Sequence, residues 1–373
     1  MATTTYLDFN ATAPLRPEAR AAVMAAFDHF GNPSSVHAFG RRARRLVEQA
    51  RGHVAALVGV PPAQVVFTGS ATEANTMALT GTGRDRVLVS AVEHDSVLSA
   101  APALRVPVDA DGLIDLAALD RLLGADPRSA VVSVMAVNNE TGVIQPVGEV
   151  AAIARRHGAL VHCDAVQAAG KMAFSLAGLG ADTLALSAHK LGGPQGVGAL
   201  VVRDGLGIQP LLRGGGQERR RRAGTENVAG IAGFGAAARA AADGLGAFAD
   251  LAALRDDLEG RLRAAAPDAQ IFGASAPRVA NTSCVLMPGV QSETQLMAFD
   301  LAGLAVSAGA ACSSGKVTPS HVLLAMGATE EEADQTLRIS LGWTTTAADV
   351  DRCVDTWTQV QARAAPRTTN AAA

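Results

Sequence analysis

The chain has 373 residues, of which 49% are hydrophobic and 18% are charged, and its formal net charge at pH 7 is −3. A chain of this length and composition can build one large or two ordinary globular domains, which excludes a disordered protein and a coiled coil. The small net charge gives the protein no electrostatic reason to coat nucleic acid or an anionic membrane, so we expect neither as a partner.

The sequence shows no sign of export or of a membrane-spanning segment. The first residues, MATTTYLDFNATAP, have no basic start and no apolar stretch, so we expect no signal peptide. The four cysteines lie far apart without a CxxC pair, which argues against both a disulfide framework and a zinc site: Cys163, Cys284, Cys312 and Cys353. We therefore expect a cytoplasmic protein that holds no metal.

Strand-like and helix-like segments alternate through the first two thirds of the chain. Helices are predicted at 17–29, 40–58 and 146–157. Apolar, β-rich runs occur at 65–69, 86–92, 130–137, 159–163, 183–187 and 198–202. Near-continuous apolar strands separated by helix-length segments indicate a mostly parallel sheet covered on both faces, which is an α/β fold.

The last third of the chain has a different pattern. After a helix at about 226–242, the composition changes to a charged amphipathic helix. A strand at 278–287, a helix at 293–303, a strand at 336–342 and a last helix follow, and we expect the tail from about 364 to be frayed. This order predicts a second, smaller α+β domain.

A rare lysine stands at the end of one predicted strand. The chain has only three lysines, and Lys190 follows the apolar run in ALSAHKLGGPQGVGAL. A lysine at a strand end, followed by small residues, is suited to bind a carbonyl compound covalently, because its amine can be desolvated and a ligand can approach the backbone closely. An isolated lysine at such a place is ordinarily a surface residue of a loop, so the function depends on two further motifs.

In the first of these motifs, LVHCDAVQAAGK, Asp164 follows a strand directly and Gln167 comes three residues later. A carboxylate there can keep a pyridine nitrogen protonated, although such an aspartate can also be a helix cap. In the second motif, VVFTGSATEAN, residues 69–72 lead from a strand into a helix and present N–H groups to an anion. Together with Lys190, these motifs predict a site for pyridoxal 5′-phosphate (PLP), and His94, at another strand end, is the candidate to stack on its ring.

These motifs are parts of a wider resemblance. The chain resembles the class V, fold type I PLP enzymes, and specifically the cysteine desulfurases (NifS/IscS-like) that supply sulfur for iron–sulfur clusters, over essentially its whole length. The matching segments are YLDFNATAP, GNPSSVHAFG, FTGSATEAN, VEHDSV, VNNETGVIQP, HCDAVQAAGK, SAHKLGGPQGVGAL, RGGGQERRRRAGTEN, SAGAACSSG and LRISLG. The resemblance implies a large PLP-binding domain at 14–248 with a mostly parallel seven-stranded sheet, and a small domain formed by 1–13 and 249–373.

The resemblance also implies roles for individual residues. Lys190 would bind PLP covalently, Asp164 would face the pyridine nitrogen, and Gln167 would face the phenolic oxygen. The residues that would lie near the ring or hold the phosphate are His94, Asn138, Ala71, Thr72, Ser187 and His189. Thr225 would reach the phosphate of the neighbouring subunit, which implies a homodimer with shared active sites.

The same resemblance points to the substrate and to the sulfur carrier. Arg338, in LRISLG, would bind the carboxylate of L-cysteine, and Asn10 and Asn138 are weaker candidates for substrate contact. Cys312 lies in AVSAGAACSSGKVTPSHV, a segment of small residues that predicts mobility and exposure, so its thiol would accept the sulfur as a persulfide. We expect the other three cysteines to be buried and inert.

Two departures and several alternatives remain. Ala308 and Ala310 stand where the family often has serine, and Ala136 stands where it often has a larger residue, which affects rate and substrate fit more than reaction class. The arginine-rich runs at 41–45 and 219–222 are interpreted as a solvated helix face and a dimer-interface loop. Three alternatives stay open for the function: a selenocysteine lyase, another class V aminotransferase and a non-enzymatic binding module. The sequence also leaves open which sulfur acceptor or iron–sulfur scaffold protein would be the partner.

Overall fold

The computed structural model describes residues 4–309 and 319–364, and its largest element is a seven-stranded sheet. Along the sheet, the strands are β2 (Val65–Thr68), β8 (Gly198–Val202), β7 (Thr183–Ser187), β6 (Leu160–Asp164), β5 (Ala130–Ser133), β3 (Arg86–Ser90) and β4 (Leu104–Val106). All neighbouring pairs are parallel except those of β8, which runs antiparallel to both β2 and β7. The predicted α/β fold with a mostly parallel sheet is confirmed.

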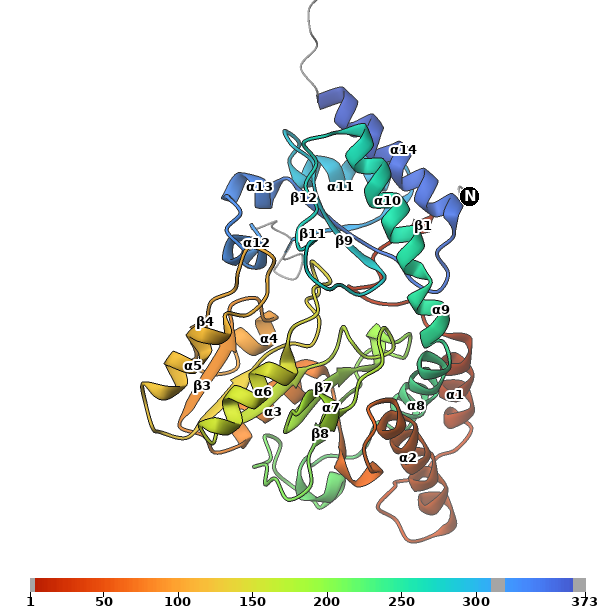
Figure 1. Cartoon of the computed structure of the whole chain (residues 1–373). Coiled ribbons are helices and arrows are strands. Elements are labelled where there is room, and N and C mark those ends of the chain that lie inside the picture. The colour runs from red at the N-terminus through yellow and green to blue at the C-terminus, as the bar shows by residue number, and fades with distance from the viewer. Residues whose placement is uncertain (1–3, 310–318, 365–373) are drawn as a thin grey trace, which may run out of the picture.

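Helices cover both faces of this sheet, as its apolar strands require (Figure 1). Alternate residues of one strand face opposite ways: Val65 packs in the core that contains Val54 of α2 and Phe234 of α8, whereas Val66 packs against Met77 of α3. The covering helices and short turns are α1 (Pro17–Phe27), α2 (Ala38–Leu57), η1 (Pro62–Gln64), α3 (Ala71–Gly81), α4 (Asp95–Leu98), α5 (Leu116–Gly124), α6 (Val147–Arg156), α7 (Leu176–Leu179), η2 (Ala188–Lys190), η3 (Gln217–Arg220) and α8 (Val228–Asp243).

The C-terminal elements form a second, smaller layer above the sheet in the view of Figure 1. An antiparallel sheet in the order β11 (Ser307–Ala308), β12 (Thr336–Ser340) and β9 (Thr282–Leu286) lies among helices, and β1 (Thr5–Tyr6) pairs in parallel with β10 (Leu304–Ala305). The helices are α9 (Leu245–Ala249), α10 (Leu251–Ala265), α11 (Ser292–Leu301), α12 (His321–Ala325), α13 (Glu330–Asp334) and α14 (Ala347–Ala364).

Most of the buried side chains fall into clusters that follow this division, although one cluster joins Val92 with Phe272 and Cys284 of the C-terminal elements. The core of the C-terminal layer contains Trp357, Phe299 and Leu258, and it also contains Leu7 from the N-terminal segment. The N-terminal segment therefore packs with the C-terminal elements, although most of the chain lies between them. We propose, on this distribution, that 14–248 forms the large domain and that 1–13 joins 249–373 in the small one.

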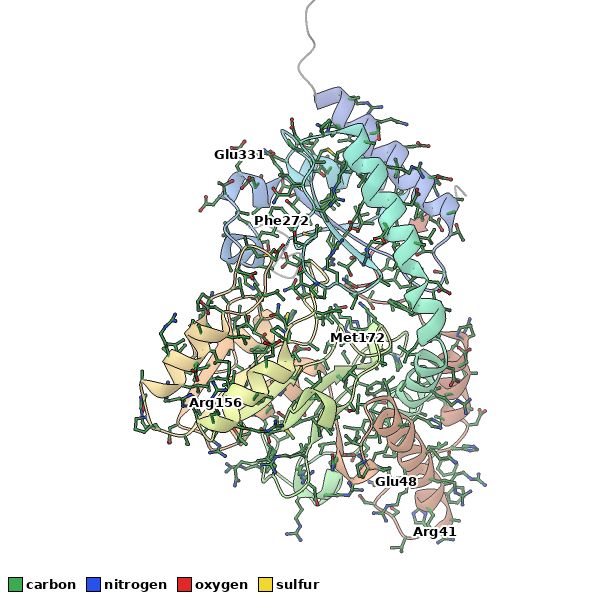
Figure 2. All side chains as sticks on the ribbon, viewed as in Figure 1. Arg41, Glu48, Arg156, Met172, Phe272 and Glu331 are labelled. Carbon is green, nitrogen blue, oxygen red and sulfur yellow. The ribbon has the colours of Figure 1, made fainter. Side chains whose placement is uncertain are left out.

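The first arginine-rich run is a solvated helix face, as predicted. The helix α2 buries Ala43, Val47 and Ala50, whereas its arginines between positions 41 and 45 are exposed. Figure 2 shows Arg41 and Glu48 on this helix at the outer edge of the molecule.

None of the helices that the structure describes combines the length and the apolar character needed to cross a lipid bilayer.

Candidate active site

A cavity of about 320 Å³ lies where the parallel strands end, between the large sheet and the C-terminal elements. Most of the site residues predicted from the sequence line it: Asn10, Ala71, Thr72, His94, Asp164, Gln167, Ser187, His189, Lys190 and Arg338. Because parallel strands end at the same edge of a sheet, residues far apart in the sequence meet here. The cavity is therefore the candidate active site.

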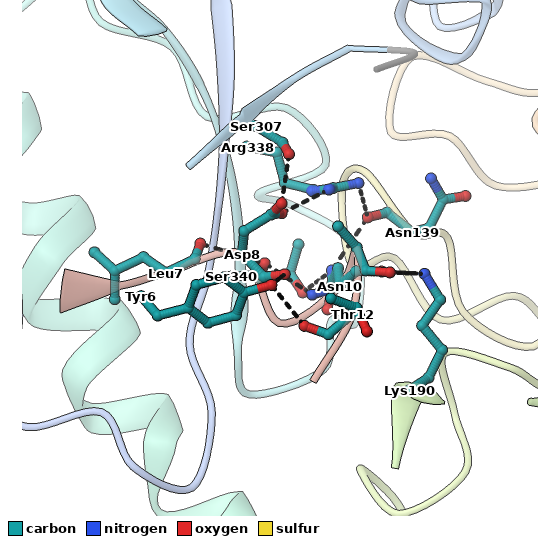
Figure 3. Close-up of polar contacts among 12 residues, drawn as sticks. Tyr6, Leu7, Asp8, Asn10, Thr12, Asn139, Lys190, Ser307, Arg338 and Ser340 are labelled. Atoms are coloured by element: carbon teal, nitrogen blue, oxygen red, sulfur yellow. Dashed lines mark hydrogen bonds and ion pairs between the residues drawn. The ribbon is translucent and has the colours of Figure 1, made fainter. Parts of the chain in front are cut away.

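Lys190 ends the short turn η2, directly after strand β7. Its Nζ donates hydrogen bonds to the backbone oxygens of Asn10, at 2.5 Å, and Ala11, at 2.7 Å. The N-terminal segment thus covers the amine from the small-domain side, as Figure 3 shows for Asn10. An amine held by two carbonyl oxygens at a cavity wall is placed to react with a carbonyl compound that enters the cavity.

Asp164 ends strand β6, and both of its carboxylate oxygens are bound. Oδ2 accepts a hydrogen bond from Asn75 Nδ2 at 2.8 Å, and Oδ1 accepts one from the backbone N–H of Val166 at 3.0 Å. Asn75 lies on α3 and is fully buried. Bonds that satisfy both oxygens fix the plane of the carboxylate, so Asp164 presents a fixed negative charge to the cavity.

A buried histidine contacts the amide oxygen of Asn75. His162 Nε2 lies 2.9 Å from Asn75 Oδ1, and its Nδ1 lies 2.8 Å from Thr183 Oγ1. Burial lowers the pKa of His162 to about 4, so its ring is neutral at pH 7. With the amide oxygen of Asn75 facing His162, its nitrogen faces Asp164. Asn75 is not among the site residues predicted from the sequence, where its only signal is a polar residue on the buried face of α3.

The first turn of α3 forms an anion cradle. Ser70 caps the helix by accepting a hydrogen bond from the N–H of Glu73 at 3.1 Å, and Ala71 and Thr72 follow at the cavity. Gly198 of β8 lets the chain approach closely, since a Cβ at that position would lie 2.5 Å from the carbonyl carbon of Ser70. The N-terminus of an eleven-residue helix at the cavity wall is suited to hold a phosphate.

Two histidines line the cavity near this cradle. His94 is the N-cap of α4, and its Nδ1 accepts a hydrogen bond from the N–H of Ser96 at 3.1 Å, which leaves Nε2 as the ring nitrogen that carries a proton. His189 Nδ1 lies 3.2 Å from the hydroxyl of Thr12. Burial, and then the charge of Lys190, lower the pKa of His189 to about 4. His189 therefore contributes a neutral ring beside Lys190.

Arg338, on β12, brings a guanidinium into the cavity from the small-domain side. It forms an ion pair of 2.8 Å with Asp8 and donates to the backbone oxygen of Asn139 at 3.3 Å (Figure 3). Ser307 holds the other oxygen of Asp8 at 2.8 Å. The Nε of Arg338 is buried and has no hydrogen-bond partner among the described residues, so the side chain can still donate to an anionic ligand.

Of the predicted site residues that the structure describes, two do not line the cavity. Asn138 is buried, and its oxygen accepts hydrogen bonds from the N–H groups of Glu140 and Thr141, so it stabilises a turn, while its neighbour Asn139 lines the cavity. Thr225 is exposed and lines a different cavity of the same subunit. Cys312 lies outside the described residues.

The remaining cysteines behave as predicted. Cys163 and Cys284 lie in strands β6 and β9, Cys353 lies in helix α14, and all three are buried free thiols. Burial raises the pKa of each, to about 12 for Cys353 and well above the ordinary value for Cys163. A buried thiol that stays protonated is a poor nucleophile.

Comparisons with known proteins agree with this geometry. Residues 5–353 match the family model described as aminotransferase class-V. A cysteine desulfurase of Cereibacter sphaeroides is 44% identical over 366 residues, which are 94% of each chain. A solved NifS-like protein of Rickettsia africae is 34% identical with a TM-score of 0.90, covering 96% of this chain and 99% of that one. A protein named SspA, solved in complex with cysteine, is 30% identical with a TM-score of 0.78 over 91% of this chain and 99% of that one.

Proposed function

The chain belongs to the aminotransferase class V family, and from this premise we propose that it is a PLP-dependent cysteine desulfurase. It converts L-cysteine to L-alanine and passes the sulfur on. The observation that carries this proposal is the cavity in which Lys190, Asp164 and the first turn of α3 meet. The names of the relatives favour this activity over the selenocysteine lyase and aminotransferase alternatives.

The residues of the cavity fit PLP. The helix α3 offers N–H groups to its phosphate, the fixed carboxylate of Asp164 suits a protonated ring nitrogen, and Lys190 suits the aldehyde. When bound, PLP supplies an electron sink that stabilises negative charge at the substrate Cα. Ser187, His189 and His94 also line the cavity, where Ser187 and His189 would contact the phosphate and the imidazole of His94 would face the ring.

The chain itself performs the binding and proton-transfer steps. Arg338 binds the carboxylate of L-cysteine through the N–H groups that Asp8 and Asn139 leave available, including the unpartnered Nε. The amine of Lys190 removes the proton from the substrate Cα and later returns a proton to the product. The carboxylate of Asp164 would accept a hydrogen bond from the ring nitrogen and so favour its protonated form.

We propose Cys312 as the thiol that takes the sulfur. Its thiolate attacks the substrate sulfur, the bond between Cβ and sulfur breaks with its electron pair left on carbon, and protonation of that carbon gives L-alanine. Two observations favour this role: the other three cysteines are buried, and Gly309 and His321, which flank the segment that contains Cys312, both line the cavity. The persulfide then goes to an acceptor or iron–sulfur scaffold protein.

We further propose a cytoplasmic homodimer in which Thr225 serves the active site of the partner subunit. Apolar side chains are exposed between α1 and α2, where Phe27, Phe30 and Val36 are 71%, 74% and 88% exposed. Phe39 stacks on Phe30 with their ring centres 4.6 Å apart. Exposed apolar side chains gathered in this way are typical of a protein interface, and a second copy of the chain is the occupant that we propose.

The experiment that tests the role of Cys312 compares the wild type with Cys312→Ser. The control is Cys353→Ser, the same substitution at a buried cysteine. We expect Cys312→Ser to keep the absorbance of bound PLP but to lose sulfide release from L-cysteine by about a thousandfold or more, since no other accessible thiol is available. Cys353→Ser should retain activity. Full activity in Cys312→Ser would refute the assignment, and failure of the wild type to bind PLP would refute the proposed function.

A further inference from the structure

A second lysine lies beside the active site, and the mechanism above does not use it. Lys171 is only 7% exposed and follows strand β6, four residues after Gln167. Its Nζ donates hydrogen bonds to Oε1 of Gln167 at 2.5 Å and to Oδ1 of Asn10 at 2.6 Å. Gln167 and Asn10 both line the cavity.

These two bonds fix the orientation of two side-chain amides. The oxygen and the nitrogen of an amide are nearly the same size, so only the hydrogen-bond partners decide which of them faces a ligand. Lys171 donates to both amide oxygens, and Asn281 Nδ2 also donates to the Asn10 oxygen at 3.1 Å, so both amide nitrogens face the other way. Accordingly, Asn10 Nδ2 donates to the backbone oxygen of Asn139 at 3.1 Å and to Thr282 Oγ1 at 2.9 Å.

The nitrogen of Gln167 is turned toward the reacting amine. Gln167 Nε2 donates one hydrogen to the backbone oxygen of Asn10 at 2.9 Å, which also accepts a hydrogen bond from Lys190. The second hydrogen of this amide is therefore available on the cavity side. A donor at this place suits an anionic oxygen on a ring bound to Lys190.

The charge of Lys171 agrees with this role. Burial lowers its pKa well below the ordinary value, and the positive charges of Lys190 and Arg338 lower it further. A neutral amine still has the two N–H groups that the two amide oxygens need. Lys171 can thus hold both amides whether its amine is charged or neutral.

We propose that Lys171 is a positioning residue for the cofactor: it holds the oxygen of Gln167 away from the cavity, so that the NH₂ group of Gln167 is presented to the phenolic oxygen of PLP. This inference rests on the proposed PLP-dependent function. Lys171 itself touches neither cofactor nor substrate, and its effect passes through the amide of Gln167.

The test measures the dissociation constant of PLP by absorbance titration of the apoprotein. Lys171→Met keeps the bulk and removes the donors, and we expect it to bind PLP about tenfold or more weakly, because a hydrogen bond to a charged oxygen is lost. Arg86→Met is the control: Arg86 is also a buried basic residue of the large domain, but it donates to backbone oxygens of Asp126 and Leu122 and does not line the cavity.

A double-mutant cycle separates positioning from a merely structural role. Gln167→Leu alone should also weaken PLP binding about tenfold, and adding Lys171→Met to it should weaken binding less than about twofold further, because no amide remains to be oriented. If Lys171→Met does not fold, Lys171→Gln, which retains one donor, should show an intermediate loss. The inference would be overturned if Lys171→Met bound PLP with wild-type affinity. It would also be overturned if the fold-loss of the double variant equalled the product of the two single fold-losses. Absence of PLP binding by the wild type would instead overturn the proposed function.

Discussion

Among the buried side chains near the cavity, Glu93 is a carboxylic acid whose pKa is raised by burial. It is fully buried, one position before His94, and its Oε1 accepts a hydrogen bond of 2.6 Å from the N–H of Met135. Burial raises its pKa to about 8, and the nearby charge of Asp164 acts in the same direction. The folded protein therefore binds a proton at Glu93 at neutral pH, whereas the unfolded chain does not.

The sign of the resulting pH dependence follows from this difference. Between about pH 4.5 and pH 8, the folded state holds one more proton than the unfolded state at this position, so the free energy of unfolding falls by about 1.4 kcal/mol per pH unit as pH rises. Glu93→Gln, which resembles the protonated acid and cannot ionise, should lack this part of the slope. The variant should gain stability relative to the wild type as pH rises.

Urea unfolding of the apoprotein at pH 5, 6, 7 and 8 measures this effect. Glu18→Gln, at an exposed glutamate of α1, is the control and should change the slope little. Parallel stability curves for the wild type and Glu93→Gln would show that Glu93 is ionised in the folded state and would contradict this expectation.

At the scale of residues, the sequence predicts the chemistry of the site better than its supporting contacts. Asp164 and Lys190 are recognisable because each follows an apolar strand at the edge where strands end. Asn138 and Asn139 are adjacent and of one type, and only the turn that uses the Asn138 oxygen decides which of them lines the cavity. Lys171 cannot be singled out either, because its partners come from segments far apart in the chain.

At the scale of elements, the segment before Thr225 shows how a strained turn is held in place. Glu218, Arg219 and Arg220 are non-glycine residues with φ of 44°, 56° and 66°, a conformation that costs free energy at each position. Arg51 of α2 binds both carboxylate oxygens of Glu218, at 2.7 and 2.9 Å, and the N–H of Phe67 in β2 donates to the same carboxylate. This buried ion pair holds the turn against the large domain.

Removing one partner of this pair should be strongly destabilising. Arg51→Met leaves the carboxylate of Glu218 buried without its cation, and we expect the free energy of unfolding to fall by about 3–5 kcal/mol. The double variant Arg51→Met with Glu218→Leu should lose less than Arg51→Met alone, because no unpaired charge remains. Denaturant unfolding measures both, and a loss in Arg51→Met below about 1 kcal/mol would contradict the role assigned to the pair.

The elements themselves were largely predictable where they are long and apolar. Six strands of the large sheet and the helices α1, α2, α6 and α8 are indicated by apolar runs and by Pro and Gly at their ends. The strand β4 was not identified from its own residues, because it has three residues at the edge of the sheet, and Leu104 and Arg105 are exposed there. An edge strand of this length carries no apolar pattern, and only pairing with β3 defines it.

At the scale of the whole molecule, the proposal of shared active sites predicts complementation between two defective chains. Lys190→Ala removes the reacting amine, and Thr225→Ala removes a proposed phosphate contact of the partner's site. In a mixed dimer, the chain that retains Lys190 meets the chain that retains Thr225, so one of the two sites is intact. Co-expressed chains with different tags should therefore bind about half as much PLP per dimer as the wild type, with wild-type affinity.

The two parent homodimers are the controls for this complementation. The Lys190→Ala dimer should bind no PLP covalently, and the Thr225→Ala dimer should bind PLP about tenfold more weakly. Weak binding in the mixed dimer, equal to that of Thr225→Ala alone, would mean that Thr225 does not serve the partner's site.

The central claim is that the amine of Lys190 binds PLP covalently, and the chain allows an unusually direct measurement because its lysines stand only at positions 171, 190 and 316. Borohydride reduction of the PLP-loaded protein, followed by peptide mapping, locates the attached group. We predict the label on the peptide that contains Lys190 and its loss in Lys190→Ala. A label on Lys171 or Lys316, or no label on any lysine, would contradict the account.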